Sequence, residues 1–375
     1  MKIRKILIVP ARTLVDKESQ SSAAAFFVNG ARFLKRNMLG LTTSVYDGEL
    51  QFYADMPEIL GRNNVYLFGS YLPHFYSRKI PAECAYPSCH GIPYPTCATA
   101  KELKSILKEV DAVLISTRAD KGHRELVGQL AQKNDIPIAM IDFKDHYSIF
   151  GVRASEEEIC RGFKKGSDYE LYFKKDLPLG QRSDAIFPLA PVPVRLESYR
   201  FSDLPKDTDI FYSGKMRAKG TGDRGDIVNL VKNNFPRSIV FEHADRSTFL
   251  SLKDYLDYMS RAKIALSPSG VVWDSFRHCE VGLAPKTLLL APRPYMEVVG
   301  PFLEDGVNAI LYETEFREGK YYLTRTGELV EKIKHYLDND AERERVANQW
   351  VADVRDGHTG VARSKYIAES IDKIL

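Results

Sequence analysis

The sequence contains no apolar run of the ~18–20 residues that a membrane-spanning helix requires. Near the amino terminus, the apolar stretch Ile6–Val9 is also too short for a signal peptide, and it predicts a buried first strand instead. We therefore expect a cytoplasmic protein without a transmembrane segment. Peripheral contact with a membrane surface is left open by these observations.

Cysteines are few, and their number of five is odd, which argues against a framework of disulfides. Cys84, Cys89 and Cys97 lie near His90 in the chain, and cysteine and histidine are the usual ligands of zinc. However, their spacing fits no Cys-x2-Cys knuckle, and the segment is rich in proline and tyrosine. A packed surface loop is therefore favoured, and we expect no bound metal.

The chain also lacks an excess of charge and a dinucleotide fingerprint. Its 53 basic and 50 acidic residues give a net charge of +3, so nucleic acid is not indicated as a partner. The first strand is followed by Pro10 and Ala11 rather than by Gly-x-Gly-x-x-Gly. A nicotinamide or flavin dehydrogenase is therefore not expected.

What the chain does contain is an alternation of short apolar runs with helical patterns, which is typical of an α/β fold. Its 375 residues suffice for two domains. Residues 1–190 are predicted to form one doubly wound, Rossmann-like domain. Its expected strands are Ile6–Val9, Thr43–Tyr46, Asn64–Phe68, Ala112–Ser116 and Ile136–Ile141, and its expected helices are Ser21–Lys35, Thr99–Lys108 and Arg124–Lys133.

Prolines divide the chain near its middle, because Pro188, Pro191 and Pro193 stiffen the backbone and remove hydrogen-bond donors. We place a linker at 191–207, a second Rossmann-like domain at 208–357 and a closing helix at 358–375 that packs back toward the first domain. The expected strands of the second half are Asp209–Ser213, Ser238–Glu242, Lys263–Ser267, Lys286–Ala291 and Asn308–Tyr312, and its helices are Asp226–Asn234, Leu252–Ala262, Thr326–Leu337, Ala341–Val354 and Gly360–Leu375. Two such domains face each other across a cleft, and ligands bind at the carboxyl edges of the sheets.

A basic loop follows the first strand of the second half. A strand that ends in Ser-Gly lets the backbone approach an anion, and nearby basic side chains can neutralise a diphosphate. The candidates for donor phosphates are Gly214, Lys215, Arg217, Lys219 and Arg224. The alternative is a solvated basic loop with no ligand.

A turn of small residues, Ser267–Gly270, precedes a short helical segment that carries Arg277 and Glu280. Ser269 and Gly270 are candidates for holding phosphate through backbone N–H groups. Arg277 and Glu280 are three residues apart, so they share one face of a helix that is otherwise largely apolar. The arginine can grip phosphate and the carboxylate can accept hydrogen bonds from sugar hydroxyls. An ordinary turn followed by a surface ion pair is the alternative.

The first domain is expected to supply the acceptor side and a general base. Asp142, Asp145 and His146 follow a predicted strand, and an Asp or His at that position can take a proton from an acceptor hydroxyl. Capping of the loop by the aspartates, with a histidine that faces solvent, explains the pattern equally well. Weaker candidates at other strand ends are Arg12, Asp16, Asp47, Arg118 and Asp120.

The order of these motifs resembles the carboxyl-terminal domain of GT-B glycosyltransferases of group 1, most of all the bacterial spore-maturation family. The resemblance is carried by Tyr212–Gly214 with Arg224, Lys263–Gly270, Arg277-x-x-Glu280, Lys286–Leu290, Phe302–Gly306, His358, Thr359, Arg363 and Tyr366, and further by Asp168–Lys175 and Ile186–Leu189. It implies that Glu280 contacts donor hydroxyls, that Gly270 lines the phosphate turn and that Arg277 supports the site. Many group 1 transferases carry a second Glu where this chain has Leu288, so the resemblance does not specify the donor sugar, the base or the stereochemistry.

The resemblance therefore implies a glycosyltransferase that moves a sugar from a nucleotide-activated donor to an acceptor hydroxyl, in cell-surface or other glycan synthesis. Catalysis is expected to need neither metal nor cofactor, since the nucleotide-sugar is a substrate and basic side chains can stabilise the leaving diphosphate. The alternatives are a GT-B-fold nucleotide-sugar epimerase or phosphotransferase, and a non-catalytic nucleotide-sugar-binding protein.

Overall fold

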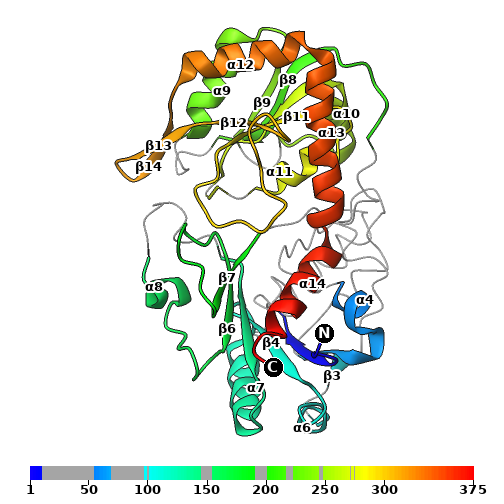
Figure 1. The fold of residues 1–375 in the computed structure, drawn as a ribbon, viewed down its shortest axis with the longest axis vertical. Helices are drawn as coiled ribbons and strands as arrows, with labels where there is room; N and C mark the ends of the chain where they lie inside the picture. Colours follow the sequence, from blue (N-terminus) through cyan, green and yellow to red (C-terminus); the bar gives the residue numbers. More distant parts are fainter. Residues whose placement is uncertain are drawn as a thin grey trace, which may run out of the picture.

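The computed structural model describes residues 1–10, 55–68, 97–98, 101–144, 154–190, 201–216, 223–244, 248–270, 272–273 and 275–375. Two α/β domains lie one above the other along the long axis of the molecule, and each is built around a parallel sheet (Figure 1). The predicted fold class, two doubly wound Rossmann-like domains followed by carboxyl-terminal helices, is confirmed.

The first domain contains a seven-stranded sheet. Its strands are β1 (Ile6–Val9), β2 (Val65–Phe68), β3 (Cys97–Ala98), β4 (Ala112–Ser116), β5 (Ile138–Asp142), β6 (Leu171–Lys175) and β7 (Ile186–Leu189), in the order β3-β2-β1-β4-β5-β6-β7. The described helices are α4 (Met56–Leu60), α6 (Leu103–Ile106), α7 (Lys121–Lys133) and α8 (Glu156–Cys160), with a 3-10 turn at Arg62–Asn64. All residues of β4 and β5 are buried, as expected for parallel strands covered on both faces.

Two expected elements of this domain, Thr43–Tyr46 and Ser21–Lys35, lie outside the described residues. Helix α7 begins at Lys121, before the predicted start at Arg124. The reason is a local cap, because the Asp120 side chain accepts the backbone N–H groups of Gly122 and His123.

The second domain contains a five-stranded sheet. Its strands are β8 (Thr208–Lys215), β9 (Ile239–His243), β10 (Ala262–Leu266), β11 (Leu288–Pro292) and β12 (Ile310–Tyr312), in the order β12-β11-β10-β8-β9. The connecting helices are α9 (Asp223–Asn234), α10 (Leu252–Arg261) and α11 (Phe276–Val281). An antiparallel hairpin of β13 (Thr314–Arg317) and β14 (Lys320–Leu323) was not predicted.

Three helices end the chain: α12 (Thr326–Asp338), α13 (Asp340–Gly357) and α14 (Gly360–Ile371). Helix α13 runs down the side of the second domain, and α14 continues to the first domain (Figure 1). There Ile367, Ala368 and Ile371 join the apolar core that contains the β1 residues Ile6 and Ile8. The last helix therefore belongs to the packing of the first domain, although it follows the second in sequence. No helix in the described part of the chain is long and apolar enough to cross a membrane.

The two domains touch near the carboxyl edge of the first sheet. The backbone N–H of Glu297 donates to the carbonyl of Leu177 over 2.8 Å, and the Glu297 carboxylate accepts the N–H of Gly180 over 2.6 Å. The ring of Phe143, just beyond β5, meets the ring of Phe276 in α11 edge-on, with centroids 6.4 Å apart. This contact places α11 against the first domain.

Candidate functional site

Helix α11 has only six residues, and its neighbours fix its position. At its start, the Ser275 hydroxyl caps the helix by accepting the N–H of Arg277. Past its end, a Cβ on Gly282 would lie 2.4 Å from Val354 and 2.8 Å from the indole nitrogen of Trp350, so α13 packs directly on the backbone there. Any larger residue at 282 would push α11 away from α13.

Arg277 and Glu280 lie on one face of α11, and Tyr255 of α10 joins them. The Tyr255 hydroxyl donates to Glu280 Oε2 over 3.0 Å and accepts from Arg277 Nε over 3.4 Å. Burial and the nearby carboxylate raise the pKa of Tyr255 well above its usual value, so it remains a proton donor. Sequence reasoning did not find Tyr255, because a tyrosine in an amphipathic helix is indistinguishable from a core aromatic.

Arg277 is also anchored to the end of the first strand of this domain. Its Nη2 donates to the carbonyl of Ser213 over 2.5 Å, and its guanidinium lies over the Tyr212 ring, 5.4 Å from the centroid. Arg277 and Glu280 both remain partly exposed. A cation and a carboxylate are thus held in fixed positions at the carboxyl edge of the second sheet, where such folds bind ligands.

Arg224 braces two strand ends. Its Nη1 donates to the carbonyl of Lys215 over 2.6 Å, and its Nε donates to the carbonyl of Ser269 over 2.9 Å. Burial lowers the pKa of Arg224, although a guanidinium stays protonated in proteins. Two of its donors are therefore engaged by the backbone, and its visible role is to tie β8 to the turn after β10.

The turn Ser267–Gly270 makes internal use of its N–H groups. Ser267 donates to the carbonyl of Leu290 over 2.8 Å, Ser269 to a carboxylate oxygen of Asp223 over 3.4 Å, and Gly270 to the carbonyl of Val272 over 2.8 Å. The remaining residue is a proline, which has no N–H. These hydrogen bonds favour the alternative of an ordinary, well-braced turn, and phosphate binding by these amides stays a prediction.

Gly214 has a packing role that the sequence did not reveal. A Cβ at this position would lie 2.4 Å from the Tyr212 hydroxyl, so the missing side chain makes room for the ring that supports Arg277. Lys215 is partly exposed, and its ammonium has no ion-pair partner among the described residues, so it is an available cation in the described part of this loop. Two other predicted cations, Arg217 and Lys219, lie outside the described residues.

In the first domain, Asp142 is buried with its side chain only 2% exposed. It accepts hydrogen bonds from the hydroxyls of Thr117 (3.1 Å) and Tyr172 (2.9 Å) and from the N–H of Lys144 (3.1 Å), and the Lys174 ammonium lies 4.0 Å away. This network favours a structural role over that of a general base. Asp145 and His146, like the weaker candidates Arg12, Asp16 and Asp47, lie outside the described residues, while Asp120 is the cap of α7.

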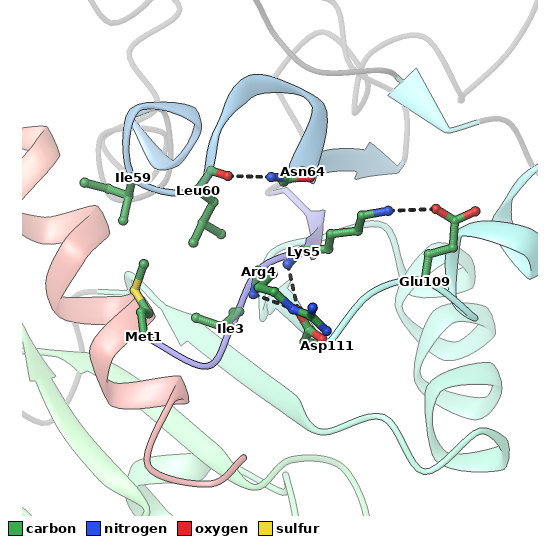
Figure 2. A pocket seen from close by; sticks show the side chains of 9 residues that line it. All are labelled: Met1, Ile3, Arg4, Lys5, Ile59, Leu60, Asn64, Glu109 and Asp111. Atoms are coloured by element: carbon green, nitrogen blue, oxygen red, sulfur yellow. Dashed lines mark hydrogen bonds and ion pairs between the residues drawn. The ribbon is translucent and has the colours of Figure 1, made fainter.

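A cavity of about 540 Å³ opens at the opposite edge of the first sheet (Figure 2). Lys5, Asn64 and Asp111 each directly precede a strand, so the cavity lies at the amino ends of β1, β2 and β4. Its polar groups are engaged locally: Lys5 pairs with Glu109 over 3.0 Å, and Asp111 accepts the N–H groups of Arg4 and Lys5. It is therefore separate from the site around α11.

No group of three or more His, Cys, Asp or Glu side chains that could hold a metal ion occurs within the described ranges. His278 and His358 are buried, and burial lowers their pKa values to about 4 and about 3. Both rings are therefore neutral near pH 7. The structure identifies neither ring as a metal ligand. Nε2 of His278 hydrogen-bonds to the carbonyl of Trp273, and Nε2 of His358 to the carbonyl of Pro301.

Comparison with known proteins adds a family match and a fold. Residues 218–369 match the model of a family described as glycosyl transferase-like. No curated protein matches the sequence. Among solved structures, HepE from Anabaena in complex with UDP-glucose aligns over 98% of this chain and 99% of its own, with 11% identity and a TM-score of 0.52. The fold is of the GT-B type.

Two further structures align over nearly the whole chain. One is a putative UDP-N-acetylglucosamine 2-epimerase from Listeria monocytogenes, with 10% identity, a TM-score of 0.45, and coverage of 98% of this chain and 96% of that one. The other is sucrose-phosphate synthase from Thermosynechococcus elongatus, with 11% identity, a TM-score of 0.44, and 99% of both chains covered. The family match includes Arg277 and Glu280, but it begins at residue 218, after Gly214 and Lys215. The narrower resemblance to the spore-maturation family stays a prediction.

Proposed function

We propose that this protein is a glycosyltransferase that moves a sugar from a nucleotide-activated donor to an acceptor hydroxyl. The observation that carries the proposal is the joint placement of Arg277 and Glu280 by Tyr255 at the carboxyl edge of the second sheet. Both residues fall inside the segment that matches the glycosyl transferase-like family, and α11 faces the first domain through Phe276. A cation and a carboxylate at this sheet edge together suit a nucleotide-sugar.

In this proposal the second domain binds the donor. Glu280 accepts hydrogen bonds from hydroxyls of the donor sugar or ribose. Among the residues that the structure describes, Arg277 uses Nε and Nη2 within the protein, so we assign Nη1 to a donor phosphate, and Lys215 supplies a second positive charge. In the reaction, the bond from the anomeric carbon to the phosphate oxygen breaks as the acceptor oxygen bonds to that carbon. The two cations stabilise the charge that develops on the leaving nucleoside diphosphate.

The acceptor must lose a proton during this transfer, and Asp142 is poorly placed to take it because its carboxylate is buried and engaged. Asp145 and His146 remain the proposed candidates for that role, from the sequence alone. We further propose that the basic side chains make a metal ion unnecessary, and that the acceptor belongs to a glycan pathway.

The test is release of nucleoside diphosphate from a panel of nucleotide-sugars, beginning with UDP-glucose because the HepE structure of this fold contains it. Mass spectrometry of the products separates transfer from epimerisation, since an epimerised donor keeps its mass. Glu280→Gln should lower turnover at least a hundredfold, while Glu242→Gln, an exposed partner of Lys232, should leave it unchanged. Equal turnover in both variants would overturn the assignment, and saturable binding without any release would identify a binding protein instead.

A further inference from the structure

We infer that Tyr255 is the positioning residue of this donor site, and that its hydroxyl holds Glu280 and Arg277 in their working arrangement. The inference rests on the proposed function, because it assigns the two held side chains to the donor. Tyr255 belongs to α10 and comes before the turn and helix that carry the other two residues. Its role is therefore to act through them.

The hydrogen bonds run in one direction. Arg277 Nε donates to the Tyr255 oxygen, and the single Tyr255 proton goes to Glu280 Oε2. Each atom thus meets a partner of the opposite kind, and the charged ends make both bonds stronger than neutral ones. Without the hydroxyl, Arg277 Nε loses an acceptor and Glu280 loses a donor at the same time.

The short helix explains why such a link is needed. With six residues, α11 cannot define the rotamers of long side chains by its own packing, and an unrestrained arginine or glutamate has several accessible rotamers. Arg277 is held at its far end by the Ser213 carbonyl of β8. The Tyr255 hydroxyl accepts a second hydrogen bond from Arg277, and it also restrains Glu280, so it joins β8, α10 and α11 at the site.

The same helix offers a matched control in Tyr258. Both rings pack against Phe211, with centroid distances of 5.7 Å for Tyr255 and 6.0 Å for Tyr258. The Tyr258 hydroxyl makes no hydrogen bond to any residue that the structure describes, whereas the Tyr255 hydroxyl makes two. Tyr→Phe at each position removes one oxygen from an aromatic that packs on the same neighbour.

The experiment compares wild type, Tyr255→Phe, Tyr258→Phe, Glu280→Gln and the double variant Tyr255→Phe/Glu280→Gln. UDP-glucose and UDP binding are measured by calorimetry, and release of UDP gives kcat and KM. We expect Tyr255→Phe to lower kcat/KM for the donor about ten- to hundredfold, with thermal unfolding close to that of Tyr258→Phe. In the Glu280→Gln background, adding Tyr255→Phe should lower kcat/KM by a smaller factor than in wild type, because only the hold on Arg277 is then left to lose.

Two results would overturn the inference: equal kcat/KM in Tyr255→Phe and Tyr258→Phe, or effects of Tyr255→Phe and Glu280→Gln that multiply in full. Failure of the proposed function looks different, because wild type itself would then release no nucleotide from any donor. In that case the calorimetric binding of UDP-glucose tests the positioning role. Weaker binding in Tyr255→Phe but not in Tyr258→Phe supports this role. Binding that is unchanged in Tyr255→Phe, or that is absent in wild type, contradicts it.

Discussion

Asp142→Asn should destabilise the first domain and leave the chemistry of the folded protein intact. The carboxylate is buried between the hydroxyls of Thr117 and Tyr172, and it faces the fully buried ammonium of Lys174. Removing the charge from one member of such a pair typically costs about 3–5 kcal/mol. Lys174 also donates to the carbonyls of Lys144 and Lys175, which share its charge, so we expect the lower end, about 3 kcal/mol.

The assay is urea denaturation of wild type, Asp142→Asn and Tyr172→Phe, followed by donor turnover below the unfolding transition. Tyr172→Phe removes one hydrogen bond to the same carboxylate and keeps the charge pair, so it should cost about 1.5–3 kcal/mol. Both variants should keep the kcat of wild type within about threefold. If Asp142→Asn instead kept its stability and lost a hundredfold or more in kcat, the carboxylate would be a general base and the structural role argued above would be wrong.

Three further predictions concern packing, pH and metal. Gly214→Ala should lower the unfolding temperature and weaken UDP-glucose binding, because its Cβ would meet the Tyr212 hydroxyl at 2.4 Å. Adding Tyr212→Leu should restore part of the stability. An unchanged unfolding temperature in Gly214→Ala would contradict the packing role of Gly214. Burial lowers the pKa values of His278 and His358, so protonation of these rings favours the unfolded chain. The free energy of unfolding should therefore be unaffected by the titration of the two histidines above pH 6.5 and should decrease as the pH falls from 6.5 toward 4. A urea midpoint in His278→Asn that declines as steeply as in wild type over this interval would show that His278 does not contribute. Dialysis against EDTA should leave donor turnover within twofold of the untreated protein, and loss that Mg²⁺ or Mn²⁺ restores would contradict metal independence.

Strand periodicity predicted the sheets well where the strands are apolar throughout. The strand at 112–116 was placed to the residue, because Ala112–Ile115 form one apolar run that Ser116, also buried, ends. The strands at 171–175 and 186–189 were missed as strands for different reasons. Lys174 and Lys175 break the apolar pattern of the first, yet both are buried and their ammonium groups are engaged, Lys174 by carbonyls and Lys175 by Asp176. Pro188 made the second resemble a linker, and proline is tolerated there because β7 is an edge strand.

The candidate site, like the sheets, could be predicted only in part from the sequence. The spacing of Arg277 and Glu280 was enough to predict one shared helix face, since that depends only on helical geometry. The predicted roles of Gly214 and Arg224 depend on what surrounds them, and the structure surrounds them with Tyr212 and with backbone carbonyls. The sequence holds no signal for Tyr255, because its partners are 22 and 25 residues away and belong to another helix.

The position of Glu280 also depends on the helices that close the chain. Trp350 of α13 donates its indole N–H to the carbonyl of His278, in the middle of α11, and its ring packs against His358 at 5.2 Å. Arg363 of α14 donates to His358 Nδ1 over 2.7 Å and to the carbonyl of Ala190, at the end of the first sheet, over 3.2 Å. A continuous set of contacts therefore runs from the first domain, through the crossing between α13 and α14, to the helix that carries the site. Because these groups are buried and hydrogen-bonded, a change in the angle between the domains must be absorbed in this chain of contacts or passed on to α11.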